Sequence, residues 1–182
     1  MSGLREDEEA LRAFFERKLA LLSTEAQPVP THEELEDRCR KEVQELHEFM
    51  TKWFLGVLPR TDEEFQRFAA VMDESYSIIT STGETKNLET LTTQLDCAHG
   101  CMQALMGQGR PGLFWIQIKD VMLQQVIKGN PMHFLITYEE WHIVPSGASG
   151  RACSVLLRDE QGKGLPNDLV WLHSHETTLP DK

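Results

Sequence analysis

The sequence predicts an α+β protein in which N-terminal helices pack against a curved antiparallel sheet. The last third of the chain reads as three strands, Met132–Val144, Arg151–Asp159 and Asp168–Glu176. Segments rich in Gly, Pro, Ser and Asn separate them, and such residues supply the backbone angles that reverse a chain. The first half instead carries apolar residues at helical spacing behind capping sequences.

Both faces of the three predicted strands carry large apolar side chains. Successive side chains point to opposite faces of a strand, so Phe134 and Ile136 share one face, whereas Leu135 and Trp141 share the other. A sheet with one face in water would alternate cleanly between apolar and polar residues. We therefore expect helices of the same chain to cover the first face and a second copy to cover the other. A bulge or a one-residue slip would exchange the two faces.

Length and charge limit the class of protein. A chain of 182 residues suits one domain with a real core. The formal net charge of −11 argues against nucleic acid and against an anionic membrane surface, because phosphate binding needs clustered Lys and Arg. No apolar run approaches the roughly 20 residues of a membrane-spanning helix. The acidic N-terminus has no signal-peptide core, so we expect a cytoplasmic protein.

The chain is predicted to divide into an N-terminal flanking segment, residues 1–30, and a folded domain, residues 31–182. Leu4–Ser23 has helical spacing, and Gln27-Pro28-Val29-Pro30 would end that helix and form a linker. Proline fixes φ and lacks the N–H donor that a helix needs.

Two helices are predicted next. The stronger one spans Thr31–Val57, starts with a capping box and stops before Pro59. A second capping box at Thr61 starts a shorter helix. The aromatic side chains of these helices either pack in a core or line a cavity, and both interpretations are open for Trp53.

The middle of the chain completes the order of elements. Ser75–Thr82 reads as a strand, Thr85–Cys97 as a helix and Leu113–Ile127 as a long strand, with a bend or bulge at Lys119-Asp120. The predicted order is therefore helix, helix, strand, helix and four strands that form a meander.

That order, on a chain of this length, resembles the NTF2-like superfamily, also called SnoaL-like, whose fold is a cone-shaped α+β arrangement. Tyr76–Gly83 resembles its first strand and turn, Leu135–Trp141 its third strand, and Val170–Glu176 its final strand. The ending His173-Ser174-His175 is similar to that of the calcium/calmodulin-dependent protein kinase II association domain. The resemblance covers Thr31 to Pro180.

The resemblance implies a cavity inside the cone and a dimer formed through the outer face of the sheet. We expect the ligand-binding residues to be Trp53, Phe65, Phe68, Met72, Tyr76, Phe134, Ile136, Tyr138, Cys153, Val155, Leu172 and Glu176. The expected dimer interface comprises Trp141, Leu156, Arg158, Trp171, His173 and His175. The kinase association domain lines its cavity with arginines, whereas the matching places here hold Tyr138, Cys153 and Glu176, which disfavours an anionic ligand.

One pair of side chains could carry out proton transfer. Tyr138 and Glu176, if both point inward, would place a hydroxyl and a carboxylate in an apolar cone. Desolvation raises the pKa of a buried carboxyl group toward the range useful in catalysis. The alternative is a Glu176 at the rim of the sheet, exposed or in a salt bridge.

Two other patterns suggest metal ligands but lack the complete set. His173 and His175 share a face, yet a site needs a third ligand and supporting residues. Cys97 and Cys101 have no second Cys or His pair to complete a tetrahedron. We therefore expect free thiols, no metal site and no cofactor.

The sequence thus predicts a dimeric domain that binds a small apolar molecule or mediates assembly. One alternative is a cofactor-free isomerase or dehydratase with a cavity carboxylate as base and Tyr138 as donor. The other is an adaptor or transport scaffold whose vestigial cavity is filled by Trp53, Phe65 and Phe68. The superfamily contains all these functions, so the fold alone does not select one.

Overall fold

The computed structural model of the chain describes residues 30–103 and 114–180. Residues 1–29, which contain the predicted N-terminal helix and most of the predicted linker, lie outside these ranges. The division into a flanking segment and a folded domain therefore stays a prediction. Within the described residues no helix combines the length and the apolar composition needed to cross a membrane.

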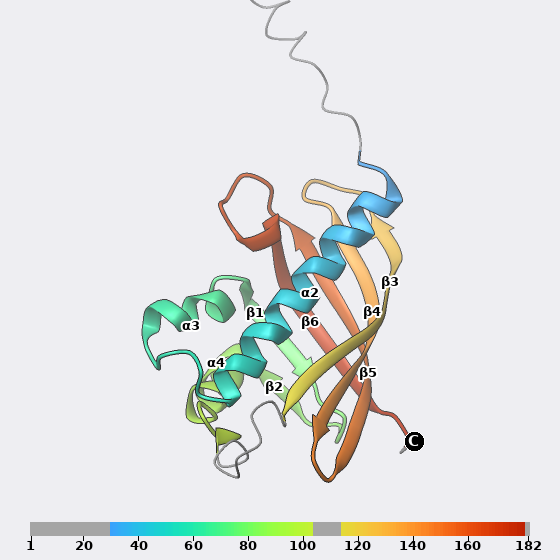
Figure 1. Ribbon diagram of the computed structural model, residues 1–182. Coiled ribbons are helices and arrows are strands. Elements are labelled where there is room, and N and C mark those ends of the chain that lie inside the picture. The colour runs from blue at the N-terminus through green and yellow to red at the C-terminus, as the bar shows by residue number, and fades with distance from the viewer. Residues whose placement is uncertain (1–29, 104–113, 181–182) are drawn as a thin grey trace, which may run out of the picture. The chain divides into compact units, whose positions relative to one another are not determined.

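The elements are those of an α+β fold and follow the predicted order, with one short strand added. Their bounds, labelled as in Figure 1, are α2 His32–Phe54, α3 Asp62–Ala69, β1 Met72–Ile79, β2 Thr85–Asn87, α4 Leu88–Cys97, β3 Trp115–Ile127, β4 His133–Val144, β5 Gly147–Asp159, the 3₁₀ turn η1 Pro166–Asp168 and β6 Leu169–Thr178.

Side-chain caps set the starts of two helices. Thr61 accepts a hydrogen bond from the backbone N–H of Glu64 at the start of α3, at 3.3 Å, as the second capping box predicts. Asn87 plays the same part for α4, where its Oδ1 accepts from the N–H of Thr90 at 3.0 Å. The predicted helix over Thr85–Cys97 therefore starts three residues too early, because residues 85–87 form β2.

The six strands form one sheet in the order β2-β1-β6-β5-β4-β3. The four-strand meander from β3 to β6 is antiparallel, as predicted. The pairing of β1 with β6 is parallel, so the sheet is mixed and not wholly antiparallel. The strands β1 and β6 are far apart in the sequence. The alternation of side chains within one strand does not show which strand pairs with it, so this parallel pairing was not predicted.

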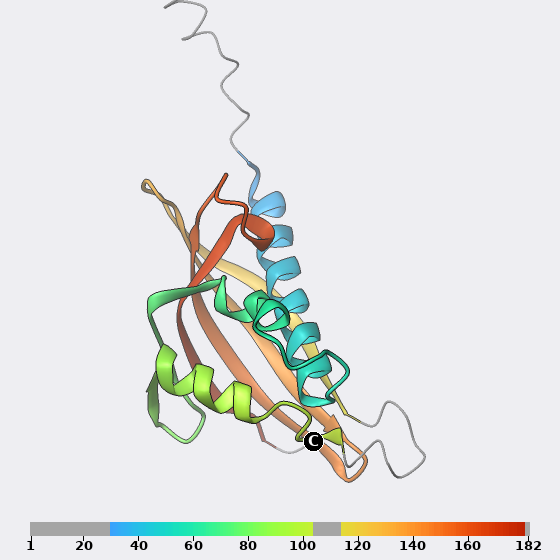
Figure 2. The ribbon, with the colours of Figure 1, turned by 90° about the vertical axis from the view of Figure 1, so that its left-hand side faces the viewer.

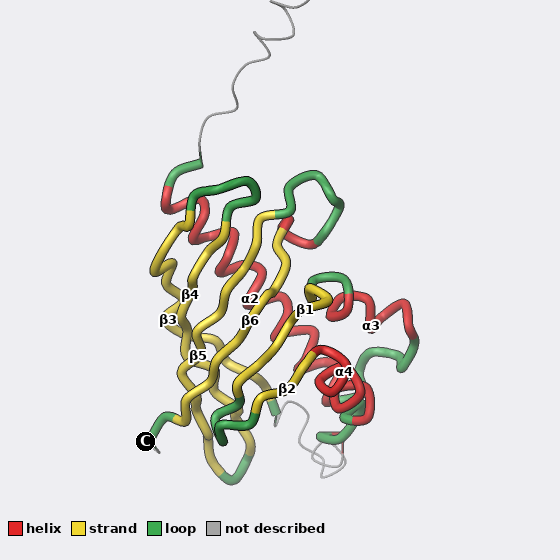
Figure 3. Tube along the Cα trace, turned by 180° about the vertical axis from the view of Figure 1, so that it is seen from behind, coloured by secondary structure: helices red, strands yellow, loops and turns green. Residues whose placement is uncertain are grey.

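The helices all lie on one side of the curved sheet. Figures 1 and 2 show α2 running across that inner face, with α3 and α4 beside its second half. Seen from behind in Figure 3, no helix of the described residues covers the outer face.

A row of apolar residues on α2 forms the centre of the core. Leu35, Cys39, Val43, Leu46, Phe49 and Trp53 are all buried. They cluster with buried residues of β4 and β5 such as Phe134, Ile136 and Val155. A spacing of three and four residues places the row on one side of a helix, as the sequence predicts.

The register of the sheet shifts at several places, and two of these shifts bear on the predictions. The pairing of β3 with β4 shifts between Lys119 and Met122 around Asp120, whose φ is 51°; this is the bulge predicted at Lys119-Asp120. The pairing of β5 with β6 shifts between Leu156 and Leu157. A bulge reverses the face to which the following side chains point, and the second one alters the functional site.

Candidate functional site

The unfilled part of the inner face forms a cavity of about 170 Å³. Its apolar wall consists of Leu46, Met50, Phe54, Phe68, Met72, Ile78, Leu91, Leu95 and Ile116. Its remaining lining is polar or aromatic and comprises His47, Tyr76, Tyr138, Glu140, His142, Arg151, Cys153, Trp171, Ser174 and Glu176. A cavity of about 150 Å³ is large enough for benzene, so a small ring compound would fit.

The structure brings one half of the predicted ligand-binding residues to this cavity. Those that line it are Phe68, Met72, Tyr76, Tyr138, Cys153 and Glu176. Phe134, Ile136 and Val155 share their face of the sheet but are fully buried in the core with α2. The reason is the path of α2, which covers one part of the inner face and leaves another part open.

Three further residues predicted at the cavity lie elsewhere. Trp53 and Phe65 pack against each other with ring centroids 5.1 Å apart, and the Trp53 indole donates to the carbonyl of Leu95 at 2.8 Å. Leu172 is the extra residue of the β6 bulge, because its neighbours Trp171 and His173 pair with Leu157 and Leu156. Of the three aromatic residues that the scaffold alternative places in the cavity, Phe68 lines it, whereas Trp53 and Phe65 do not.

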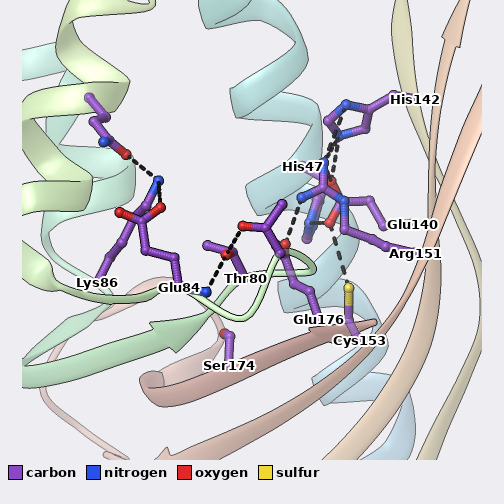
Figure 4. Close-up of polar contacts among 12 residues, drawn as sticks. His47, Thr80, Glu84, Lys86, Glu140, His142, Arg151, Cys153, Ser174 and Glu176 are labelled. Atoms are coloured by element: carbon purple, nitrogen blue, oxygen red, sulfur yellow. Dashed lines mark hydrogen bonds and ion pairs between the residues drawn. The ribbon is translucent and has the colours of Figure 1, made fainter. Parts of the chain in front are cut away.

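A buried carboxylate, Glu140, organises the polar end of the cavity (Figure 4). It is 6% exposed. Its Oε1 accepts a hydrogen bond from His142 Nε2 at 2.6 Å, and its Oε2 lies 3.3 Å from His47 Nε2. Arg151 Nη2 lies 3.7 Å from Oε1. Burial alone would raise the pKa of Glu140, but His47, His142 and Arg151 together hold it well below its usual range.

His47 connects α2 to this carboxylate. Its Nδ1 lies 2.7 Å from the carbonyl oxygen of Val43, one helical turn earlier, and its Nε2 faces Glu140. Both partners are acceptors, so both contacts are hydrogen bonds only when each ring nitrogen carries a proton. His47 therefore links the backbone of α2 to the buried carboxylate.

Arg151 lies between two carboxylates. Its Nη1 donates to Glu176 Oε2 at 2.8 Å, and its Nη2 side approaches Glu140. Burial lowers the pKa of Arg151, yet Glu140 and Glu176 outweigh that effect and the net shift is upward. The sequence leaves two environments open for Glu176, an inward position in the apolar cone and a rim position that is exposed or in a salt bridge. In the structure Glu176 forms a salt bridge, with Arg151. Glu176 nevertheless lines the cavity.

Two tyrosines and a thiol complete the polar lining. Tyr76 donates to Ser174 Oγ at 2.8 Å. The Cys153 thiol donates to Glu140 Oε2 at 3.8 Å, and Tyr138 also lines the cavity. Burial is the main reason that the pKa of Tyr138 lies well above its usual value. Tyr138 is therefore a neutral hydrogen-bond donor.

Trp171 is the clearest correction to the sequence analysis, which expected it in the dimer interface. It is 3% exposed, lines the cavity and donates through its indole N–H to Glu42 Oε1 at 3.1 Å. The bulge at Leu172 turns Trp171 to the inner face, whereas His173 and His175 pair with outer-face residues. The alternation therefore assigns Trp171 to the wrong face.

The other residues expected in the dimer interface lie on the outer face. Trp141 is already covered by its own chain: Lys119 lies over its ring, and a Cβ on the facing Gly150 would come within 2.8 Å of it. Leu156 is half-buried, and Arg158 forms salt bridges with Asp73 and Glu160. No group of three His, Cys, Asp or Glu within the described ranges could hold a metal ion.

The sequence analysis missed the central residues of the cavity, namely His47, Glu140, His142 and Arg151. Two of them continue patterns that it used. Glu140 follows Tyr138 by two positions on β4, and Arg151 precedes Cys153 by two positions on β5, so each shares the inner face with the residue that was named. The alternation along β4 and β5 therefore places Glu140 and Arg151 on the inner face, although neither residue is among the predicted ligand-binding residues.

Comparisons with known proteins place the chain among related folds. The family model of the sucrose-6-phosphate phosphohydrolase C-terminal domain matches residues 39–180. None of the curated proteins matches. An NTF-2-like protein of unknown function from Pseudomonas aeruginosa aligns with a TM-score of 0.63 and 22% identity, over 79% of this chain and 99% of that one. This similarity confirms the predicted NTF2-like fold.

Two further solved structures align less closely. A putative calcium/calmodulin-dependent kinase II association domain from Exiguobacterium sibiricum has a TM-score of 0.43 and 14% identity, over 85% of this chain and 98% of that one. An NTF2-like protein of unknown function in nutrient uptake from Rhodospirillum rubrum has a TM-score of 0.46 and 11% identity, over 76% and 96% of the two chains.

Proposed function

The chain belongs to the sucrose-6-phosphate phosphohydrolase C-terminal family, and we propose that this NTF2-like member binds a small, largely apolar molecule in its cavity. One observation carries the proposal: an apolar cavity ends at a cluster of charged groups, the buried Glu140 and the half-buried Arg151 and Glu176. A concave apolar pocket with a few converging polar groups and shifted pKa values is the usual form of a ligand site.

The energetic cost of this cluster supports a role beyond folding. Taking an ion out of water costs several kcal/mol, and apolar residues of similar volume often give a more stable protein than a buried ion pair. An apolar core at Glu140 and Arg151 would therefore serve stability as well. We attribute the charged groups to recognition of a ligand.

Hydrolysis of a sugar phosphate, the activity named in the family's description, has no support in this cavity. A phosphate group needs cations that are available to it, and Arg151 is already bound by Glu176. The volume of about 170 Å³ is also below the roughly 300 Å³ at which pockets for drug-sized ligands begin.

Proton transfer has less support than binding. The isomerase or dehydratase alternative needs a carboxylate that readily accepts a proton, which requires a pKa near the working pH. Glu140 has a lowered pKa, and Glu176 holds the Arg151 guanidinium. Tyr138 could still donate a hydrogen bond to a substrate, as the isomerase or dehydratase alternative requires. Neither Glu140 nor Glu176, however, is a suitable base to accompany it.

The test is a titration followed by NMR, with the Trp171 indole N–H as reporter because Trp171 lines the cavity. We expect at least one of cyclohexanecarboxamide, cyclohexanecarboxylate and cyclohexylmethylammonium to shift that signal. Leu91→Trp, which fills the cavity from α4, should abolish the shift. Thr90→Trp, on the exposed side of the same helix, should not. Absence of binding by all three probes would refute the proposal.

We propose secondly that two copies of the chain pair through the outer face of the sheet. The supporting observation is that the outer face carries Leu135, Leu156 and the half-exposed Met122, while no helix of the described residues covers it (Figure 3). Light scattering after size exclusion should give the mass of a dimer, and Leu156→Asp should give a monomer. Val57→Asp, an equal change at an exposed site off this face, should remain dimeric. A monomeric wild type contradicts this proposal.

A further inference from the structure

The charged groups that line the cavity are paired with one another. Arg151 is the guanidinium among the lining residues that the structure describes, and it is shared by Glu176 at 2.8 Å and Glu140 at 3.7 Å. His47, from α2, faces Glu140 on the other side, and His142 donates to it. Two carboxylates thus face one guanidinium and two histidines, and Arg151 is already paired with Glu176.

This pairing of the charged groups disfavours a charged ligand of either sign. An anion that approached Arg151 would have to displace the Glu176 carboxylate or lie beside two carboxylates in a medium of low dielectric constant, where like charges repel strongly. A cation would meet Arg151 and the imidazole of His47. An uncharged polar group avoids both penalties, because it needs only a hydrogen bond.

Ser174 offers such a hydrogen bond. Its Oγ accepts from the Tyr76 hydroxyl at 2.8 Å, so its own hydrogen is available for another acceptor. Ser174 and Glu176 are two positions apart on β6 and both line the cavity. A carbonyl or hydroxyl oxygen of a ligand would find this donor in the cavity that the paired Arg151 and the apolar wall also line.

We propose that the cavity selects an uncharged molecule of roughly six to ten non-hydrogen atoms, with an apolar ring or chain and one carbonyl or hydroxyl oxygen, and that Glu176 sets this selectivity by neutralising Arg151. The inference depends on the proposed binding function. It adds the chemical class of the ligand and the residue that excludes anions.

The experiment compares two probes of the same shape, cyclohexanecarboxamide and cyclohexanecarboxylate, by NMR titration at pH 7. The wild-type protein should bind the amide at least tenfold more tightly than the carboxylate. Glu176→Gln removes one negative charge and releases the Arg151 guanidinium, so it should bind the carboxylate at least tenfold more tightly than the wild type does. Glu48→Gln, the same change on an exposed part of α2, should keep the wild-type preference.

The outcomes separate this inference from the binding function. If neither probe binds, the binding function fails and the inference fails with it. If the wild type prefers the carboxylate, or if Glu176→Gln leaves the ratio of the two affinities unchanged, only the selectivity is refuted. Should Glu176→Gln fail to fold, the double variant Arg151→Met with Glu176→Gln removes both partners. It should bind the amide without gaining affinity for the carboxylate, and such a gain would overturn the role given to Arg151.

Discussion

Glu42 and Glu140 are both buried glutamates, and each accepts several hydrogen bonds, but their surroundings differ. Glu42, which is 0% exposed, accepts from Arg67, Asn167 and Trp171 and thereby ties α2 to α3, η1 and β6. Glu140 accepts from side chains that line an open cavity. The first carboxylate joins packed elements, and the second borders unfilled space.

The pKa values of the two carboxyl groups move in opposite directions. Burial raises the pKa of Glu42 although Arg67, Asn167 and Trp171 donate to it. At Glu140 the histidines and Arg151 outweigh burial, so its pKa is lowered. The neighbours of Glu140 in the cavity thus stabilise its ionised form enough to outweigh burial, whereas the neighbours of Glu42 do not. This difference fits a cavity whose charged groups stay ionised and paired beside unfilled space, whereas the Glu42 carboxylate links packed elements through Arg67, Asn167 and Trp171.

Glu140→Gln should have the largest effect on stability, because it leaves His47 and Arg151 with an incomplete partner. Loss of one member of a buried ion pair costs about 3–5 kcal/mol. A group with a lowered pKa contributes stability above its unfolded pKa of about 4.3 and loses that contribution as the pH falls through its folded value. The difference in unfolding free energy between wild type and variant, measured in urea, should therefore be constant at neutral pH and shrink below about pH 4.5.

A loss below about 1 kcal/mol for Glu140→Gln would place this carboxylate in the class of weak surface pairs. It would also remove the contrast with Glu42.

Asn167→Ala tests the packed region and should have the next largest effect. The Asn167 amide donates to Glu42 at 2.9 Å and to Glu45 at 2.8 Å, and its φ is 53°. Because Asn167 is half-buried, we take the lower values for both effects. A hydrogen bond to a charged group contributes about 1.5 kcal/mol and the left-handed conformation costs Ala about 1 kcal/mol, so we expect a loss of about 2.5 kcal/mol.

Asn167→Gly is the matched control for that variant. It loses the same hydrogen bonds but adopts a positive φ without strain, so it should be about 1 kcal/mol more stable than the alanine variant. Equal stabilities of the two variants would mean that the backbone moves to another conformation.

Glu42→Gln should cost less than Glu140→Gln at pH 7, about 1–3 kcal/mol, because it leaves the Arg67 guanidinium with an uncharged partner. Glutamine resembles the protonated carboxyl group, and burial shifts the pKa of Glu42 upward, in the direction of that form. The contribution of Glu42 is fully present below its unfolded pKa and declines as the pH rises through the folded value. The difference between wild type and variant should therefore narrow with rising pH above about 4.5, opposite to the trend for Glu140→Gln. Parallel pH trends would contradict the comparison.

Local patterns in the sequence predict most of the fold. Alternation gives the strands of the meander, and apolar spacing gives the buried row of α2. The start of β5 is placed four residues too late, because Gly147-Ala148-Ser149-Gly150 has the composition of a loop, although it pairs with the end of β4. The parallel pairing of β1 with β6 depends on packing between distant segments, and local patterns do not contain it.

The candidate site is less predictable for two physical reasons. Alternation places Tyr138, Cys153 and Glu176 on the inner face correctly, but the single extra residue Leu172 places Trp171 on the wrong one. His47 comes from a helix, and only the crossing of α2 over β4 brings it to Glu140. A bulge and a helix crossing are properties of the assembled sheet.

Cys153→Ser should have the smallest effect, and Cys39 provides its control in the core. Both thiols are buried, and burial raises the pKa of Cys39 to about 12. Cys153 faces the Glu140 carboxylate, so a serine hydroxyl there has an acceptor and the change should cost less than about 1 kcal/mol. Cys39 lies among apolar residues, where an unpaired hydroxyl costs about 1–3 kcal/mol. Equal losses of unfolding free energy in urea would mean that the Cys153 site is as apolar as the core, and the polar end of the cavity would then not be a hydrogen-bonding site.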